Sequence, residues 1–348
     1  MALDDLSADW IAQRINAPLG LALRRRDIGA GQVARCVLLE LCDGDTVVAS
    51  VVGKGPSGDP TSASTASAQR LYLRETSFYA ELAPLIGTPT PTCYLVQRDD
   101  ADNFLLLLED MSPSAALDQF DGLTLDYVRR GLSALAQLHA PTRNDGSLHE
   151  RAWLNGTKLA LAPLYQAILP SLYQTFLERY ADSASQDVLN LVGSFAQRLG
   201  QFSSYTSPYT CVVHGDFRTD NLLFDARGGD VPLAVVDWQT VSTSSPMLDV
   251  AYFLVTSLTS EDCIAHCDEL LAYYCEESSR LGAPLTLSDI RSEFARYVLQ
   301  PVSMLAPAAV IVERTERGDR MFLEMLQRAS VVAEHVGALE ELDRHAAS

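Results

Sequence analysis

The hydrophobic pattern of this chain changes its period along the sequence, and the change limits the folds that the chain can adopt. Over residues 21–52, apolar and polar residues alternate in VARCVLLEL and TVVASVV, which are separated by the turn signal Asp43-Gly44-Asp45. We therefore expect an antiparallel hairpin of two or three strands. Two further strands are expected around TCYLVQR and NFLLLLEDM.

A helical period appears between these strand pairs and again in the rest of the chain. Apolar residues at 71, 78, 79, 82 and 85 predict a helix, and the small polar residues 55–69 before it predict a mobile loop. From residue 123 onward the pattern is mainly helical, interrupted by short β segments in TCVVHGDF, NLLFD and PLAVVDW. Helices are expected at 6–17, 125–140, 158–181, 186–203, 261–281, 287–299 and 317–343.

These elements predict an α+β fold with two lobes. The first lobe, residues 1–111, is a small antiparallel sheet with one packed helix, and the second, residues 112–348, is mainly helical. A hinge is expected near residues 108–112. A chain of 348 residues is long enough for two cores.

Composition and charge exclude several classes of partner. The formal net charge of −19 repels phosphate backbones and anionic lipid headgroups, so we expect no nucleic-acid or membrane partner. No run reaches about 20 consecutive apolar residues, and the N-terminus lacks the order of a signal peptide. The seven scattered cysteines predict reduced thiols in a cytoplasmic protein. For Cys263, His266 and Cys267 a core cysteine pair is favoured over a metal site.

The densest chemical signal lies in residues 211–254. One apolar run ends in His214-Gly215-Asp216, with Asn221 five residues after Asp216, and a second run ends in Asp237. Phosphoryl transfer from ATP needs a group that orients the acceptor hydroxyl and takes its proton, and divalent cations that neutralise the triphosphate. A carboxylate and an amide on one tight loop, with a second carboxylate at a strand end, meet both needs. Magnesium prefers hard oxygen ligands of this kind.

HGDFRTDN followed by VVDWQ resembles the catalytic and metal-binding loops of the aminoglycoside phosphotransferase and choline kinase-like families, which are relatives of the protein kinases. The DWQ triplet is most similar to the ecdysteroid kinase-like branch. The resemblance spans nearly the whole chain, because the N-terminal features occur in the expected order. It implies a protein-kinase-like fold, with ATP and Mg²⁺ as cofactors and the nucleotide between the lobes.

The resemblance also implies roles for individual residues. Asp216 would be the catalytic base, and Asn221 and Asp237 would be the magnesium ligands. Arg218 stands where protein kinases usually have a lysine beside the transferred phosphate, which implies a charge-stabilising catalytic role; solvent exposure is an equally weighted alternative. Of the remaining residues, His214 would structure the loop, Asp249 would brace it from a following helix, and Asp220 would be a loop-capping acid.

In the first lobe the resemblance implies a nucleotide site. Lys54 would contact the ATP phosphates and pair with the helix residue Glu75, for which Arg74 is a competing cation. Gly29 and Gly31 would let backbone amides approach the phosphates, although a plain hairpin turn explains them too. Backbone groups at the hinge, in Leu108-Glu109-Asp110-Met111, would bind adenine.

Only eleven residues separate Asp237 from Asp249, which leaves no room for a peptide-binding activation segment. We therefore expect an ATP- and magnesium-dependent kinase whose acceptor is a small-molecule hydroxyl, such as an aminoglycoside, choline, a nucleoside, a sugar or a sterol-like alcohol. GTP fits the same pattern. The alternative is a nucleotide-binding pseudokinase that acts as a sensor or scaffold, whose mark would be the loss of Lys54, Asp216, Asn221 or Asp237. All four are present.

Overall fold

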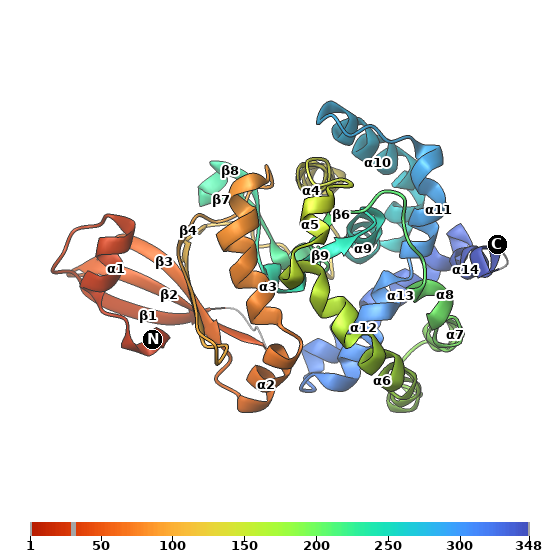
Figure 1. Ribbon diagram of the computed structural model, residues 1–348, viewed down its shortest axis with the longest axis horizontal. Helices are drawn as coiled ribbons and strands as arrows, with labels where there is room; N and C mark the ends of the chain where they lie inside the picture. The colour runs from red at the N-terminus through yellow and green to blue at the C-terminus, as the bar shows by residue number, and fades with distance from the viewer. Residues whose placement is uncertain (1, 29–32, 347–348) are drawn as a thin grey trace. The chain divides into compact units, whose positions relative to one another are not determined.

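The computed structural model describes residues 2–28 and 33–346 (Figure 1), and contacts divide the chain into two compact units. The sheet unit comprises Met1–Ala115 and Leu223–Val241, and the helical unit comprises Ala116–Leu222 and Ser242–Ser348. The expected boundary at residue 111 assigned residues 223–241 to the helical lobe, whereas their contacts group them with the sheet. Whether the functional lobes follow that boundary stays a prediction.

The sheet unit is built on a five-stranded antiparallel sheet with the order β1-β2-β3-β5-β4. One face is covered by the N-terminal segment, whose Leu3 and Ile11 join a core cluster with Leu39, Val51 and Leu107. Gly53 permits that contact, because a Cβ there would lie 2.6 Å from Leu3 Cδ2. The elements are η1 (Leu3–Asp5), α1 (Ala8–Ile15), β1 (Ala22–Ile28), β2 (Ala34–Asp43), β3 (Thr46–Pro56), β4 (Cys93–Arg98) and β5 (Phe104–Glu109).

The opposite face of the sheet packs against α3 (Leu71–Ser77), which continues into the π-helical turn η2 (Phe78–Leu82) and the turn η3 (Ala83–Leu85). The prediction of a mobile loop at residues 55–69 is wrong, because α2 (Pro60–Ala68) forms there. The Asp59 carboxylate caps this helix by accepting the Ser62 N–H at 2.7 Å. Asp-Pro is a helix-start signal that the small, polar composition concealed.

Residues 223–241 join the sheet unit through a second hairpin. It consists of β7 (Leu222–Ala226) and β8 (Val231–Val235), and it is followed by the turn η7 (Trp238–Thr240). Ala226 and Ala234 form a small core cluster with Met111, and the Arg227 N–H donates to the Met111 carbonyl at 2.9 Å. These contacts explain why the segment does not belong to the helical unit.

The helical unit contains most of the expected helices. The predicted segments 186–203 and 317–343 each break into two helices, and α12 was missed because Pro301 and Pro307 obscure its pattern. The elements of the helical unit are α4 (Leu125–His139), α5 (Gly146–His149), α6 (Thr157–Arg179), α7 (Gln186–Ala196), α8 (Leu199–Ser203), β6 (Cys211–Val213), β9 (Ser242–Ser244), α9 (Met247–Ser257), α10 (Ser260–Arg280), α11 (Leu287–Tyr297), α12 (Gln300–Ile311), α13 (Glu316–Val336) and α14 (Ala338–Ala346).

Helix α9 lies at the centre of the helical unit. Every residue of it except Leu248 is buried, and it contacts α4, α10, α11, α12 and α13. Its approach to α4 requires Gly131, where an added Cβ would lie 2.4 Å from Phe253 Cζ. Side chains on α9 therefore have little freedom to move.

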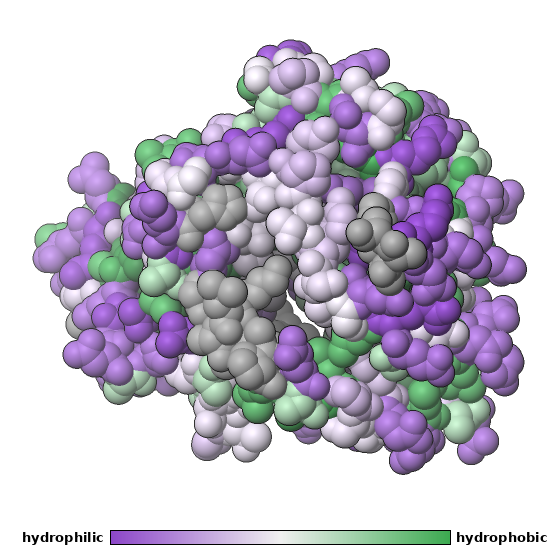
Figure 2. Space-filling view, turned by 45° about the vertical axis from the view of Figure 1, so that its right-hand side comes forward, coloured by the Kyte–Doolittle hydropathy of each residue, from purple (hydrophilic) through white to green (hydrophobic). Residues whose placement is uncertain are grey.

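Two observations bear on the surface and on membrane crossing. The face seen in Figure 2 has hydrophilic residues over much of its area, with hydrophobic residues scattered among them. In the described part of the chain, Leu287–Ile311 is long and apolar enough to cross a membrane by length and composition alone, but 72% of its window is buried inside the protein. Burial of that kind is typical of core helices.

We predict that Gly131→Ala destabilises the protein although alanine favours helix. Overpacking against Phe253 costs about 1–3 kcal/mol, which exceeds the gain of about 1 kcal/mol from helix propensity. The matched control is Gly193→Ala in α7, where the new Cβ meets only Leu177 Cδ1 at 3.9 Å, so the propensity gain stands alone. Urea unfolding measures the free energy of unfolding of both variants and of the wild type. If both are stabilised, the close packing of α4 on α9 is refuted.

Candidate active site

The loop after β6 is fixed to α9 through its backbone. The His214 N–H donates to Asp249 Oδ2 at 2.6 Å, and the Gly215 N–H donates to Asp249 Oδ1 at 2.8 Å. Asp249 has no exposed surface, so its two oxygens take the place of water as amide acceptors. Gly215 has a φ of 87°, in the left-handed region that favours glycine. The resemblance-based role of Asp249 as a brace agrees with these contacts.

Histidine side chains complete the bracing of the loop. His139 of α4 has Nε2 at 3.3 Å from Asp249 Oδ2 and Nδ1 at 2.9 Å from the Tyr274 hydroxyl. The Asp216 N–H donates to His214 Nδ1 at 3.2 Å. Both imidazoles are fully buried. His214 thus shapes the turn that presents Asp216, as expected for a loop-structuring residue.

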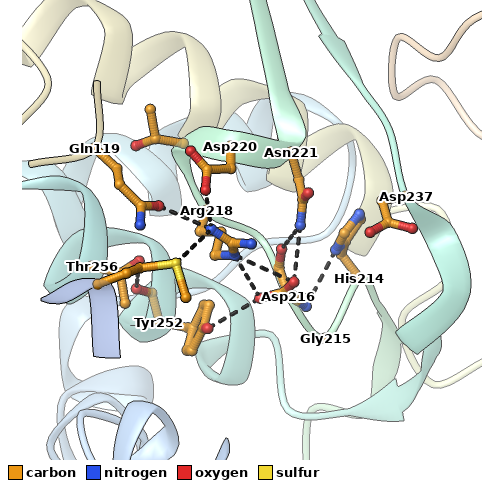
Figure 3. A network of polar contacts seen from close by, with 12 residues as sticks. Gln119, His214, Gly215, Asp216, Arg218, Asp220, Asn221, Asp237, Tyr252 and Thr256 are labelled. Atoms are coloured by element: carbon orange, nitrogen blue, oxygen red, sulfur yellow. Dashed lines mark hydrogen bonds and ion pairs between the residues drawn. The ribbon is translucent and has the colours of Figure 1, made fainter. Parts of the chain in front are cut away.

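The carboxylate of Asp216 is surrounded by three donors in the helical unit, which point toward it from different directions (Figure 3). Asn221 Nδ2 donates to Oδ2 at 3.0 Å and to the Asp216 carbonyl at 2.8 Å. The Tyr252 hydroxyl donates to Oδ1 at 3.0 Å, and Arg218 Nε lies 3.3 Å from Oδ1 and 3.4 Å from Oδ2. The carboxylate is thus held in place but still 18% exposed, so a ligand can reach it.

Arg218 is mostly buried, with 18% of its side chain exposed, which contradicts the solvent-exposed alternative. Its Nη1 donates to Asp220 Oδ2 at 2.5 Å and to Gln119 Oε1 at 3.0 Å. Burial alone would lower the pKa of Arg218, but the negative charges of Asp216 and Asp220 outweigh it and raise the pKa. Arg218 therefore keeps its positive charge beside Asp216.

In the sheet unit, Lys54 of β3 lies between two carboxylates. Its Nζ is 2.7 Å from Glu75 Oε1 on α3 and 2.8 Å from Asp237 Oδ1. Burial alone would lower the pKa of Lys54, but Asp237 and Glu75 outweigh it and hold the pKa well above its ordinary value. Glu75 pairs with Lys54, while the Arg74 guanidinium donates to the Gln69 carbonyl at 3.0 Å. The group has one more negative charge than positive, an excess that favours a bound cation.

Asp237 is held in a demanding backbone conformation by the residues that follow it. Its φ of 67° and ψ of 62° lie in the left-handed region, which non-glycine residues adopt rarely and often at functional sites. Gln239 Nε2 donates to Asp237 Oδ2 at 3.1 Å. The fully buried Trp238 stacks on Phe78, with ring centroids 3.8 Å apart. The stack fixes the turn against the segment that continues α3.

The predicted hinge residues lie at and just beyond the end of β5. The Glu109 N–H already donates to the Thr92 carbonyl at 2.8 Å, and the Glu109 carboxylate accepts from Thr92 and pairs with Arg227 at 3.1 Å. Within the described residues no acceptor is recorded for the Met111 N–H. The Met111 N–H is therefore available to a ligand acceptor, whereas the Glu109 N–H is not. Gly29 and Gly31 lie outside the described residues.

Asn221 of the helical unit and Asp237 of the sheet unit each offer an oxygen atom of the kind that magnesium prefers. Because Asn221 uses its Nδ2 to bind Asp216, its carbonyl oxygen is the atom left for a cation, and Asp237 supplies a carboxylate. Both are hard oxygen ligands. The described ranges contain no group of three or more His, Cys, Asp and Glu side chains that could hold a metal ion.

The structure therefore collects the predicted site residues in two groups, each within one unit. Asp216, Arg218 and Asn221 lie together in the helical unit, and Lys54, Glu75 and Asp237 lie together in the sheet unit. Sequence reasoning missed four residues that contact these groups: Gln119, Tyr252, Trp238 and Gln239. The last two belong to the DWQ triplet, so their signal was already in the motif. Tyr252 lies three residues after Asp249, a spacing that places both on one side of α9.

Comparison with known families decides the classification. The sequence profile of the ecdysteroid kinase-like family matches residues 33–281, well over half of the chain. The chain belongs to this family. It is thus a member of a kinase-like family, which confirms the similarity that the DWQ triplet indicated.

Solved structures share the fold. The microcompartment-associated aminopropanol kinase matches over 93% of this chain and 96% of its own, with 14% identity and a TM-score of 0.56. A GDP complex of a variant aminoglycoside 2′-phosphotransferase-IIIa matches over 94% and 97%, with 19% identity and a TM-score of 0.54. These likenesses confirm the α+β, protein-kinase-like fold.

Two curated proteins match shorter stretches. Acyl-CoA dehydrogenase family member 10 of Mus musculus is 34% identical over 87 residues, which are 24% of this chain and 8% of that protein. Acyl-CoA dehydrogenase family member 11 of Gallus gallus is 32% identical over 75 residues, which are 22% and 10%. The matches span a tenth or less of these relatives.

We predict that Asp249→Ala strongly destabilises the helical unit. The substitution leaves two buried amides without an acceptor, and losing one side of a buried charged network costs about 3–5 kcal/mol. Asp249→Asn keeps one acceptor oxygen and is expected to lose less. Urea unfolding followed by far-UV circular dichroism compares the two variants with the wild type. An unchanged midpoint for Asp249→Ala would show that the loop does not depend on this carboxylate.

Proposed function

We propose that this protein is an ATP- and magnesium-dependent kinase that transfers the γ-phosphoryl group to a hydroxyl of a small molecule. The observation that supports it most is the Asp216 carboxylate, which is presented on a braced loop, restrained by neutral and cationic donors, and still reachable. A residue that only stabilised the fold would not need to remain accessible. Membership of the ecdysteroid kinase-like family also supports a kinase.

In this proposal Asp216 orients the acceptor. The acceptor hydroxyl donates its hydrogen bond to the carboxylate, which takes the proton as the oxygen attacks the γ-phosphorus. The new O–P bond forms while the bond between the γ-phosphorus and the β–γ bridging oxygen breaks, and ADP leaves with that oxygen. Positioning and electrostatic stabilisation supply most of the rate enhancement in such a transfer.

The other residues bind and neutralise the nucleotide. Lys54, kept charged and restrained by Glu75, would contact the phosphates, and the Met111 N–H, with backbone groups of Glu109, would bind adenine. Gly29 and Gly31 would let backbone amides approach the phosphates. Magnesium held by Asn221 and Asp237 would offset charge on the phosphate oxygens. Arg218 would stabilise charge on the transferred group through Nη2, for which no partner is recorded in the parts that the structure describes.

The acceptor is a small alcohol, because the segment between Asp237 and Asp249 is too short to bind a peptide. Two properties of the protein favour different chemical classes of acceptor. The net charge of −19 favours a cationic amino alcohol, and the family of this chain favours a less polar alcohol. A panel of acceptors should therefore contain both classes.

We predict that Asp216→Ala lowers turnover by about a thousandfold, within the range for loss of a positioned acid–base group, and leaves the fold intact. ADP release is measured with ATP and magnesium against aminoglycosides, choline, nucleosides, sugars and sterols, and circular dichroism checks the fold. The control is Asp182→Ala, an exposed carboxylate on the same unit, which should behave as wild type.

Near-normal turnover by Asp216→Ala would remove this residue from its role. Nucleotide binding with no ADP release for any acceptor or water would instead favour the pseudokinase alternative. If neither binding nor turnover is detected, the proposal of a kinase is wrong.

A further inference from the structure

Tyr252 touches the candidate catalytic carboxylate and has no role in the assignments above. Its side chain is fully buried in α9, and its hydroxyl donates to Asp216 Oδ1 at 3.0 Å. Figure 3 shows the ring lying on the opposite side of Asp216 from Asn221. The same helix holds the loop backbone through Asp249, three residues earlier. Helix α9 therefore contacts both the backbone of this loop and the side chain that the loop presents.

A carboxylate on a fixed backbone still has one soft degree of freedom. The last torsion of an aspartate joins an sp³ to an sp² carbon, and its energy profile is broad. Asn221 binds only Oδ2, so by itself it leaves the carboxylate free to tilt about that contact. A donor on Oδ1 removes this freedom, and Tyr252 is the neutral donor in that position.

Arg218 does not orient the carboxylate in the same way. Its Nε is nearly equidistant from the two oxygens, at 3.3 and 3.4 Å, so it attracts the carboxylate without selecting a tilt. Its Nη1 is committed to Asp220 and Gln119. Arg218 thus supplies charge, whereas the selection of an orientation falls to Tyr252 and Asn221.

The environment of Tyr252 keeps its hydroxyl a donor. Burial, and then the negative charge of Asp216, raise the pKa of Tyr252 well above its ordinary value, so the phenol stays protonated. The ring is enclosed on a helix that five others surround, which limits its movement. A protonated phenol that donates to Oδ1 orients the Asp216 carboxylate without adding a charge to the site.

We propose that Tyr252 is a positioning residue that sets the orientation of the Asp216 carboxylate toward the acceptor hydroxyl. The inference rests on the proposed function, because it needs Asp216 to receive that hydroxyl. A purely structural tyrosine would affect stability alone, while a positioning tyrosine affects the chemical step through Asp216.

The test compares Tyr252→Phe with Tyr180→Phe. Tyr180 is also fully buried in the helical unit, and its hydroxyl donates to the Asp319 carboxylate at 2.6 Å, so both variants lose the same kind of hydrogen bond. ADP release from magnesium-ATP is measured with water as the acceptor and with any panel alcohol that the wild type uses. We expect kcat to fall about tenfold for Tyr252→Phe, the cost of one hydrogen bond to a charged group, with KM for ATP unchanged. Tyr180→Phe should keep the wild-type kcat.

A double-variant cycle shows whether Tyr252 acts through Asp216. In the Asp216→Ala background, Tyr252→Phe should lower the residual rate no further. The inference is overturned if Tyr252→Phe lowers kcat by the same factor in the wild-type and Asp216→Ala backgrounds. It is also overturned if Tyr252→Phe changes only KM, or leaves kcat unchanged. If Asp216→Ala lowers turnover about a thousandfold and Tyr252→Phe keeps the wild-type kcat, this inference is overturned while the proposed function stands. Turnover that survives Asp216→Ala overturns both.

Discussion

Asp249 places a carboxylate in the core of the helical unit, where no water reaches it, and the hydrogen bonds that it accepts shape the candidate site. A buried charge of this kind is tolerated only when its oxygens are occupied by donors. Here two consecutive amides of the catalytic-loop candidate occupy them, with His139 close to one oxygen. The need to satisfy the charge therefore also fixes the loop.

Helix α9, which carries Asp249, makes further contacts with the same loop. Tyr252 binds the Asp216 carboxylate, and the Ser257 hydroxyl accepts from the buried Thr219 at 3.1 Å. Contacts from one rigid helix to several points of a loop restrain that loop more than separate contacts from mobile segments would. Arg328 of α13 extends the restraint, because its guanidinium donates to the carbonyls of Gln119, Phe120 and Thr256.

The sheet unit uses a buried cation in a comparable way. Lys54 is one of only two lysines in a chain in which nearly every basic residue is arginine. Its compact ammonium lies 2.7 Å from the Glu75 carboxylate and 2.8 Å from the Asp237 carboxylate. The Trp238–Phe78 stack holds the turn that brings Asp237 to it. Glu75 fixes the other side, so the ammonium has a defined position.

The sequence predicted the parts of the fold that leave local patterns. The alternation in residues 33–52 gave β2 and β3, and helical spacing gave α4, α10 and α11. It failed where local signals conflict with structure: α2 has the composition of a loop, and α12 contains two prolines. The DWQ motif indicated the family correctly, because its residues are adjacent and their chemistry is specific.

Contacts between distant residues could not be predicted in the same way. Lys54 and Asp237 are 183 residues apart, and nothing local indicates their contact. Tyr252 lies in an apolar helix where an aromatic residue fits a core position equally well. Its hydroxyl acquires a partner only through the fold. The grouping of residues 223–241 with the sheet unit likewise depends on contacts of Met111 that no periodicity reveals.

The most direct test of the central claim asks whether Lys54 meets the phosphates of ATP. An acyl-phosphate derivative of ATP transfers its acyl group to a lysine beside the bound phosphates, and peptide mass spectrometry locates the product. With only Lys54 and Lys158 in the chain, the result is unambiguous. The account predicts magnesium-dependent acylation of Lys54 that excess ATP prevents, with no ATP-sensitive acylation of Lys158. Acylation of Lys54 that ATP does not reduce, or none at all, would contradict nucleotide binding at this site.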